Sequence, residues 1–152
     1  MVNLEVTNEE ILKEATEYLV SQNTGFLATS GSAGLRVSPV TIFLNDETNI
    51  FMHCYGGDKM TNLRENSEAC LLVIEENLAL EPGLYQGVQV FGEAKEIPQE
   101  SETYQKAEIW CPYTHKNQMT MLEFRPKSMV VVDYPEGEKR KRSLELELKE
   151  GQ

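Results

Sequence analysis

Hydrophobic side chains repeat with a helical period only at the start of this chain. They recur three and four residues apart, at Ile11, Leu12, Ala15, Tyr18 and Leu19. This spacing predicts an amphipathic helix that ends near Gly25. The preceding residues 7–10, Thr-Asn-Glu-Glu, are typical of a capping box, in which the Thr7 hydroxyl accepts a hydrogen bond from the amide of Glu10.

After the helix the pattern changes to short β-branched and aromatic runs separated by turns rich in Gly, Ser and Asn. These runs predict six strands, at 26–29, 35–44, 50–54, 69–75, 86–97 and 121–134. Two short helices are predicted between them, at 58–65 with Asp58 as its cap and at 101–110. No regular βαβ repeat is present. The order therefore predicts a mainly β protein, an antiparallel barrel of about six strands with peripheral α-helices.

Three details of this pattern lead to further expectations. Pro39 cannot donate to a strand ladder, so we expect it at a bulge or where its strand faces something other than a strand. The run 69–74 is apolar throughout, which predicts burial on both faces. In the charged tail from residue 136, leucines alternate with glutamates over 144–148. The alternation favours a strand, whereas Glu, Lys and Leu also favour a helix, so both remain open.

Length and composition indicate a single domain spanning residues 1–152. Lys and Arg number 14 against 25 Asp and Glu, and this net charge of −11 argues against nucleic-acid and anionic-membrane partners. The apolar runs are too short to cross a bilayer, and the N-terminus lacks the pattern of a secretory signal. Cys54, Cys70 and Cys111 form no CxxC pair, so we expect a reduced, cytoplasmic protein in which Cys111 is the most exposed thiol.

Several kinds of catalytic site have no support in the sequence. His53 and His115 stand far apart and outside any HExxH motif, so no metal site is predicted. The sequence has no GxSxG elbow, GxGxxG fingerprint or P-loop. It therefore gives no support to the hydrolases, nicotinamide Rossmann enzymes and NTPases that use those motifs.

One group of residues does indicate a binding site. Within the first 63 residues the basic side chains are Lys13, on the solvent face of the first helix, Arg36 and Lys59. Lys59 opens a helix after Gly56-Gly57, where unpaired amides and the helix dipole favour an anion. Together with Arg36 this arrangement predicts a phosphate site on the rim of the barrel. The alternative is that Arg36 pairs with a cross-strand carboxylate and Lys59 lies in solvent.

Five consecutive segments carry a resemblance to a known family: Gly25–Thr29, Arg36–Val40, Ile50–His53, Lys59–Asn66 and Ala69–Ile74. They match, in order, a G-x-L-A-T strand, an R-x-x-P-V strand, an aromatic-rich strand, the motif K-x-x-N-L-x-x-N and an apolar strand. With them, residues 8–97 resemble the FMN-binding split-barrel family, the pyridoxamine 5'-phosphate oxidase-like proteins. Residues 101–134 are similar to it in layout.

The resemblance implies a homodimer of split barrels with two FMN sites at the subunit interface. It places one strand along the isoalloxazine ring. The residues of this strand, whose backbone amides and carbonyls would face the ring, are Arg36, Val37, Ser38, Pro39, Val40 and Thr41. Met52 and His53 match positions that contact the flavin or its ribityl chain. Lys59 and the helix amides near Asp58 would hold the phosphate, with Arg36 as a second positive group.

The chain also departs from the namesake oxidases. Asp58 stands where they carry a basic residue before the helix lysine, Thr41 replaces a lysine, and Gly87 replaces a glutamine although Gln86 is adjacent. Their terminal Arg-x-His segment, which grips the pyridoxal phosphate substrate, is absent. We therefore expect FMN binding without efficient oxidation of pyridoxamine phosphate. The layout is closer to the stress-protein and nitroimidazole-reductase-like branches.

The function predicted first is an FMN-dependent oxidoreductase that passes electrons from a reduced nicotinamide to a small electrophilic substrate. No catalytic residue is predicted, because hydride transfer belongs to the cofactor. One alternative is a flavin-binding electron carrier without a dedicated substrate. Another is a split barrel that uses the deazaflavin F420 or haem, with His53 or His115 as the axial ligand. Trp110 is expected in the core, or else stacked on the flavin of the second subunit.

Overall fold

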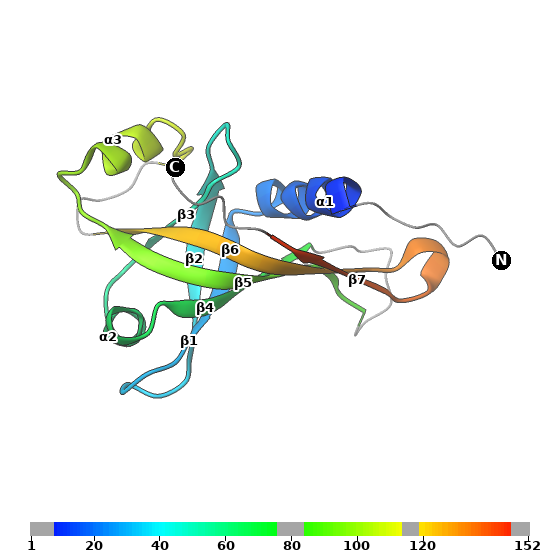
Figure 1. The fold of residues 1–152 in the computed structure, drawn as a ribbon, viewed down its shortest axis with the longest axis horizontal. Helices are drawn as coiled ribbons and strands as arrows, with labels where there is room; N and C mark the ends of the chain where they lie inside the picture. Colours follow the sequence, from blue (N-terminus) through cyan, green and yellow to red (C-terminus); the bar gives the residue numbers. More distant parts are fainter. Residues whose placement is uncertain (1–7, 76–83, 114–118, 147–152) are drawn as a thin grey trace.

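Seven strands form in the part of the chain that the computed structural model describes, which is residues 8–75, 84–113 and 119–146 (Figure 1). The strands are β1 (Thr24–Thr29), β2 (Arg36–Leu44), β3 (Ile50–Cys54), β4 (Glu68–Glu75), β5 (Gln86–Ile97), β6 (Thr120–Asp133) and β7 (Arg140–Glu145). The helices are α1 (Asn8–Ser21), α2 (Asp58–Glu65), α3 (Glu102–Glu108) and the short 3-10 helix η1 (Pro135–Gly137). The expected capping residue Thr7 lies outside the described residues.

The strands pair in the order β3-β2-β1-β4-β5-β6-β7, and β3 also pairs with β6. This last pairing closes the first six strands into a barrel, and every pairing is antiparallel. The mainly β, antiparallel barrel with peripheral helices is therefore confirmed. β7 adds to β6 outside the closed ring, with Leu144 opposite Met129 and both side chains buried. The tail that the sequence left open is thus a strand over residues 140–145.

The core lies inside the barrel and beneath α1. Alternate strand residues point inward, as a period of two requires. The largest fully buried side chains include Leu27, Ile42, Met52, Leu71, Leu122 and Phe124. α1 adds Ile11, Ala15 and Leu19 from one face to the same cluster. The helical spacing in the sequence therefore identified the face of α1 that packs against the barrel core.

α3 covers a second, smaller core on the outer side of β2 and β3. This cluster consists of Phe43, Phe51, Ile97, Tyr104, Ala107 and Met121, with Cys111 and Tyr113 packed against it. The Phe43 and Phe51 rings stack with their centroids 5.6 Å apart. α3 is shorter than predicted, because Ser101 is its cap and accepts from the amide of Tyr104 at 3.2 Å.

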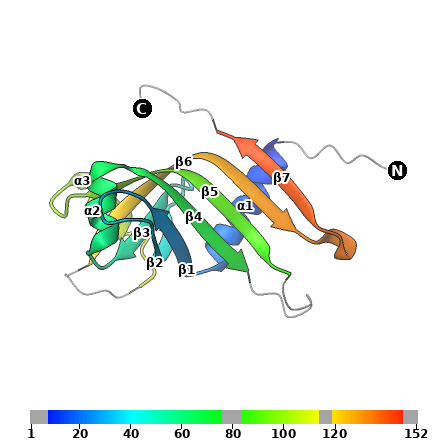
Figure 2. The ribbon, with the colours of Figure 1, turned by 90° about the horizontal axis from the view of Figure 1, so that it is seen from below.

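The opposite side of the barrel carries an exposed apolar surface. Figure 2 shows β1, β4, β5, β6 and β7 side by side, with α1 crossing behind them. Several apolar side chains on these strands point outward and are half-buried or exposed. Together we call them the outer apolar face: Phe26, Ala28, Cys70, Leu72, Ile74, Phe91, Val130 and Val132. The strand register makes it continuous across β1, β4 and β5, since Phe26 lies opposite Leu72 and Cys70 opposite Phe91, whereas the exposed Gln89 lies between Leu72 and Val130. The prediction that 69–74 is buried on both faces is therefore wrong for this chain, in which only the inward face of β4 is fully buried.

Among the described residues, no helix is both long and apolar enough to span a membrane.

Candidate functional site

The N-terminus of α2 lies against the start of β2 and brings the predicted phosphate residues together. Arg36 Nη2 lies 3.1 Å from Asp58 Oδ2, and Arg36 Nε donates to the carbonyl of Ala33 at 3.1 Å. Both charged side chains are largely open to solvent, at 48% exposed for Arg36 and 63% for Asp58. The alternative that Arg36 pairs with a carboxylate is thus partly realised, although this carboxylate comes from α2 and not from a neighbouring strand.

Among the described residues no side chain caps α2, which leaves its first amides available. The capping residue is Gly57, not Asp58 as the sequence predicted, and its φ of 118° favours glycine because a Cβ would be strained there. Gly57 O accepts from the amides of Met60 and Thr61. The geometry of a helix start gives the amides of Asp58 and Lys59 no acceptor within the helix. Lys59 Nζ makes a long, exposed contact of 3.4 Å to Gly56 O.

These groups form what we call the anion cradle: the α2 amides of Asp58 and Lys59 and the side chains of Arg36 and Lys59. Two cations and the positive end of a helix dipole suit a phosphate. Asp58 opposes them, because its carboxylate places a negative charge at the same helix start. The cradle therefore has the chemistry for an anion, with Asp58 lowering its net positive charge.

Asn62 fastens the cradle to the hairpin turn between β1 and β2. Its side chain is fully buried; Nδ2 donates to Gly34 O at 2.7 Å, and Oδ1 accepts from the amide of Ala33 at 3.1 Å. Gly31 allows this approach, since a Cβ there would lie 2.6 Å from Asn62 Oδ1. Glu65 also accepts from the amide of Ser32 at 2.8 Å. The turn that delivers Arg36 is thus held by one face of α2.

The hydrogen bonds from Ser32 have a second consequence at Glu65. The side-chain bond and then the backbone bond hold the pKa of the Glu65 carboxyl below its usual value, because both stabilise the charged form. The residue types of the K-x-x-N-L-x-x-N segment were visible in the sequence. Their task of holding the 30–34 turn was not visible, because the turn and the helix are about thirty positions apart.

β2 offers an unpaired backbone edge next to the cradle. Arg36 to Thr41 pair with β1 along their whole length, whereas β3 pairs only with Thr41–Leu44. Residues 36–40 therefore have a strand on one side and none of the described strands on the other. Pro39 sits opposite Phe26 in regular register, so no bulge is present there. Pro39 thus lies in the part of β2 whose second edge faces no described strand, which agrees with the expectation from the sequence.

Met52 and His53 lie inside the chain, away from solvent. Met52 belongs to the barrel core, and His53 lies under α3 with 1% of its surface exposed. Their strand pairs with β2 on one side and with β6 on the other, and a flavin contact by either residue stays a prediction. His115, the other histidine considered as a ligand, lies outside the described residues.

Trp110 lies in the turn that follows α3. Its side chain is 45% exposed, and that of Ile109 beside it is 78% exposed. The expectation of a core tryptophan is therefore wrong, since the helix ends at Glu108 before it can direct the ring inward. Stacking on the flavin of a second subunit stays a prediction.

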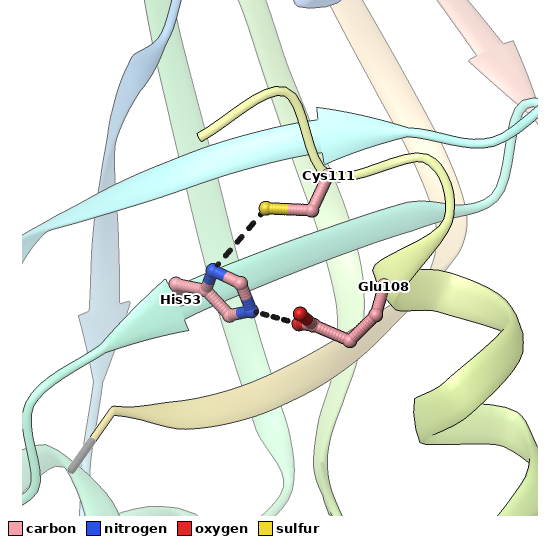
Figure 3. Close-up of side chains that lie close together, drawn as sticks. All are labelled: His53, Glu108 and Cys111. Atoms are coloured by element: carbon pink, nitrogen blue, oxygen red, sulfur yellow. Dashed lines mark hydrogen bonds and ion pairs between the residues drawn. The ribbon is translucent and has the colours of Figure 1, made fainter. Parts of the chain in front are cut away.

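A third group of side chains meets beneath α3, as Figure 3 shows. His53 Nε2 lies 3.0 Å from Glu108 Oε1, and His53 Nδ1 lies 3.7 Å from Cys111 Sγ. Burial raises the pKa of the Cys111 thiol; the backbone at Tyr113 lowers it and the charge of Glu108 raises it, both by smaller amounts. This cluster is not visible in the sequence, because His53 lies more than fifty positions before the other two residues. Only Glu108 and Cys111 are close together along the chain.

The three ligand-type atoms of this cluster lie within 4.8 Å of one another. The sequence predicted no metal site. Among the described residues, the group of side chains that could hold a metal ion is His53, Glu108 and Cys111.

A closed antiparallel barrel with the helix start of α2, Arg36 and Lys59 on its rim defines a small β-barrel protein with a candidate anion site. The sequence profile of the pyridoxamine 5'-phosphate oxidase family matches residues 11–149. The chain therefore belongs to this family, in agreement with the resemblance found in the sequence. No curated protein sequence matches significantly.

Solved structures share the fold at low sequence identity. A haem-binding protein of Mycobacterium smegmatis superposes with a TM-score of 0.67 and 17% identity, over 86% of this chain and 57% of that longer one. HutZ, the haem storage protein of Vibrio cholerae, superposes with a TM-score of 0.65 and 18% identity, over 83% and 95%. An FAD-binding protein of Mesorhizobium loti superposes with a TM-score of 0.57 and 18% identity, over 77% and 90%. Identities this low establish the fold alone.

Proposed function

We propose that this protein binds FMN and passes electrons from a reduced nicotinamide to a small electrophilic substrate. The observation that carries the proposal is the anion cradle, which lies next to the unpaired edge of β2 in a member of this family. When bound, FMN supplies the hydride chemistry, and the protein supplies binding and orientation.

The residues of the cradle fit a flavin phosphate. Two amides and the Lys59 ammonium donate to phosphate oxygens, and Arg36 adds a planar guanidinium of the kind that binds phosphate with two parallel hydrogen bonds. Asp58 already pairs with Arg36, so its carboxylate competes with the phosphate for that guanidinium. This competition favours moderate affinity over the tightest binding.

The edge of β2 supplies groups suited to the ring system. Its backbone from Arg36 to Val40 has donors and acceptors that no described strand uses. The side chain of Val37, 73% exposed, stands beside them as an apolar contact. A planar heterocycle with alternating donors and acceptors at one edge can bind there as a short strand would.

A second copy of the chain is the partner that we propose for the outer apolar face. Monomeric proteins rarely expose a continuous apolar surface that crosses several strands. At one end of this face a depression of about 450 Å³ is lined by residues that include Leu35, Cys70 and Phe91. Leu35 directly precedes Arg36, so a partner seated on the face would reach the cradle.

Pyridoxamine phosphate is not the substrate that we propose. Thr41 stands where the resemblance places a lysine in the namesake oxidases. Asp58 would also repel a second phosphate near the cradle.

Haem is the second candidate ligand, because two of the similar structures are named for it. His53 is poorly suited to be the axial ligand. Its ring is 1% exposed, and its two nitrogens face Glu108 and Cys111. We therefore favour flavin over haem on the geometry of this side chain.

An absorbance spectrum of the purified protein, followed by titration with FMN and riboflavin, tests the proposal. We expect flavin bands near ~370 and ~450 nm and tighter binding of FMN than of riboflavin, because riboflavin lacks the phosphate. A Soret band after purification would favour haem. Equal affinity for the two flavins would place the phosphate outside the cradle.

A further inference from the structure

The side chain of His53 is held between a carboxylate and a thiol. Figure 3 shows its imidazole, which comes from β3, with Glu108 of α3 at one nitrogen and Cys111 at the other. The ring is 1% exposed and packs 5.2 Å from the ring of Phe43, so its orientation is fixed. The cysteine reaches it from the segment after α3, where its thiol can also donate to the carbonyl of Tyr113, 3.5 Å away.

The hydrogen-bonding capacity of these groups assigns the imidazole tautomer. A carboxylate only accepts hydrogen bonds, so the nitrogen 3.0 Å from Glu108 carries the hydrogen. In a neutral imidazole the other nitrogen, Nδ1, then has a lone pair, and this lone pair faces Cys111 Sγ at 3.7 Å. A thiol, its base and a group that orients the base thus stand in one row, which is the arrangement of an activated nucleophile.

We propose that Cys111 is a nucleophilic thiol that adds to uncharged α,β-unsaturated carbonyl compounds, with His53 as its base and Glu108 as the residue that positions the base. In this step Sγ forms a bond to the β-carbon of the electrophile while its proton passes to His53 Nδ1. The electron pair of the carbon–carbon double bond moves to the α-carbon, which then takes the proton from His53. The product is a thioether, and the step needs no oxidant or reductant.

The surroundings of Cys111 explain why a base is needed. Burial raises the pKa of this thiol, so the group is protonated at neutral pH and a poor nucleophile by itself. The titratable groups that face it among the described residues are His53 from β3, Tyr104 and Glu108 from α3, and Tyr113. Of these, the imidazole is the one that takes up a proton near neutral pH.

The surface next to the thiol favours an uncharged, apolar electrophile. Ile109 and Trp110, directly before Cys111, expose 78% and 45% of their surface. The chain carries a net charge of −11, which repels anions.

The same atoms could instead hold a metal ion, since all three lie within 4.8 Å of one another. For a shared zinc ion, the sulfur, one nitrogen and the carboxylate must converge on a point roughly 2.0–2.3 Å from each. Here the imidazole lies between the other two groups, with a different nitrogen toward each. This arrangement favours the transfer of a proton over shared ligation.

Labelling with N-ethylmaleimide, itself an uncharged unsaturated carbonyl compound, tests the proposal. Peptide mass mapping gives the rate at each cysteine in the purified folded protein and in protein unfolded by guanidinium, from pH 5 to 9. We expect Cys111 to react at least about tenfold faster in the folded protein at pH 7, because a placed base accelerates such steps by two orders of magnitude or more. We also expect its rate to level off within this pH range, because a base-assisted rate stops rising once the base is fully neutral.

Two variants separate the base from the packing. His53→Gln should reduce the folded-state rate of Cys111 below that of the unfolded chain. Glu108→Gln, at a side chain 31% exposed, should reduce it by a smaller factor and shift the pH at which it levels off. If circular dichroism shows that His53→Gln does not fold, Glu108→Gln alone tests the proposal.

Two results would overturn the proposal. One is a folded-state rate at Cys111 slower than in the unfolded chain and still rising tenfold per pH unit at pH 9, as for an ordinary half-buried thiol. The other is one equivalent of zinc that binds the wild type but not Cys111→Ser and blocks labelling, which would make the cluster a metal site. FMN takes no part in the labelling, so neither result bears on the proposed flavin site.

Discussion

A single buried amide, Asn62, holds together the two segments that form the anion cradle. Its side chain satisfies one backbone carbonyl and one backbone amide of the 30–34 turn, at Gly34 and Ala33. Asn62→Ala would remove the partner of both groups on a turn that is partly open to water, at about 0.5–1.5 kcal/mol for each hydrogen bond lost. We expect the free energy of unfolding in urea to fall by about 1–3 kcal/mol. Thr61→Ala, exposed on the same helix, should change it little; equal effects would show that the turn is held elsewhere.

Lys59 is the cation of the cradle with the fewest competing contacts. Lys59→Ala removes a charge-assisted contact to the flavin phosphate, worth roughly 1.5–3 kcal/mol, so FMN affinity should fall about tenfold to one-hundredfold. Titration by flavin fluorescence at two salt concentrations measures this, since a partly exposed contact weakens with salt. Riboflavin should bind the variant and the wild type equally, and Lys13→Ala on α1 should affect neither flavin. Unchanged FMN affinity would place the phosphate elsewhere.

Asp58 should act in the opposite direction. Its carboxylate pairs with Arg36 at 3.1 Å and opposes an incoming phosphate. Both groups are largely exposed, so their pairing contributes little, about 0–1 kcal/mol. Asp58→Asn should therefore raise FMN affinity by about twofold to fivefold, with riboflavin affinity unchanged. A loss of FMN affinity would mean that Asp58 positions Arg36 and does not compete with the phosphate.

At the scale of elements, β7 is held to the barrel by a buried charge. The guanidinium of Arg142, 9% exposed, contacts Glu14 of α1 and lies 3.2 Å from Asp133 at the end of β6. Removing one member of a buried ion pair is costly because its partners stay desolvated. Glu14 can regain water, since 38% of its side chain is exposed. Arg142→Ala should therefore lower stability by about 2 kcal/mol, less than for a fully enclosed pair.

Hydrogen exchange gives this prediction a local readout. Amides of residues 140–145 should exchange faster in Arg142→Ala, while those of β4 and β5 should change only with global stability. Lys141→Ala, exposed on the same strand, serves as the control. Uniform acceleration over all strands would show that β7 unfolds only together with the barrel.

At the scale of the whole molecule, the outer apolar face should determine assembly. Leu72 lies near its middle, opposite Phe26 on β1. A dimer seated there should bury more than about 1,000 Å², and Leu72→Glu would place a charge without a partner inside it. We expect the wild type to sediment at twice the 17.3 kDa mass of the chain and the variant as a monomer with weakened FMN binding. Val20→Glu, at an exposed apolar residue on α1, should stay dimeric. A monomeric wild type at micromolar concentration would rule out the dimer.

Strand and helix positions were largely predictable because their periods are local. The segments 50–54, 58–65 and 86–97 have the predicted bounds, since turn residues and alternating side chains mark their ends. The cap of α2 was not predictable in the same way. Asp58 is a favoured capping residue, but the cap is Gly57, whose φ of 118° follows from the path of the chain out of β3.

The mainly β character of the chain and the order of its strands and helices follow from the sequence alone, because periodicity, turns and helix starts depend on near neighbours. Tertiary structure alone decided which partners meet across long separations. Asn62 holds a turn about thirty positions earlier, and His53 meets Glu108 and Cys111 more than fifty positions later. It also decided burial: the apolar β4 has an inner and an outer face, and Trp110 lies outside the core. Such contacts follow from how strands and helices pack, and no local pattern of residues encodes them.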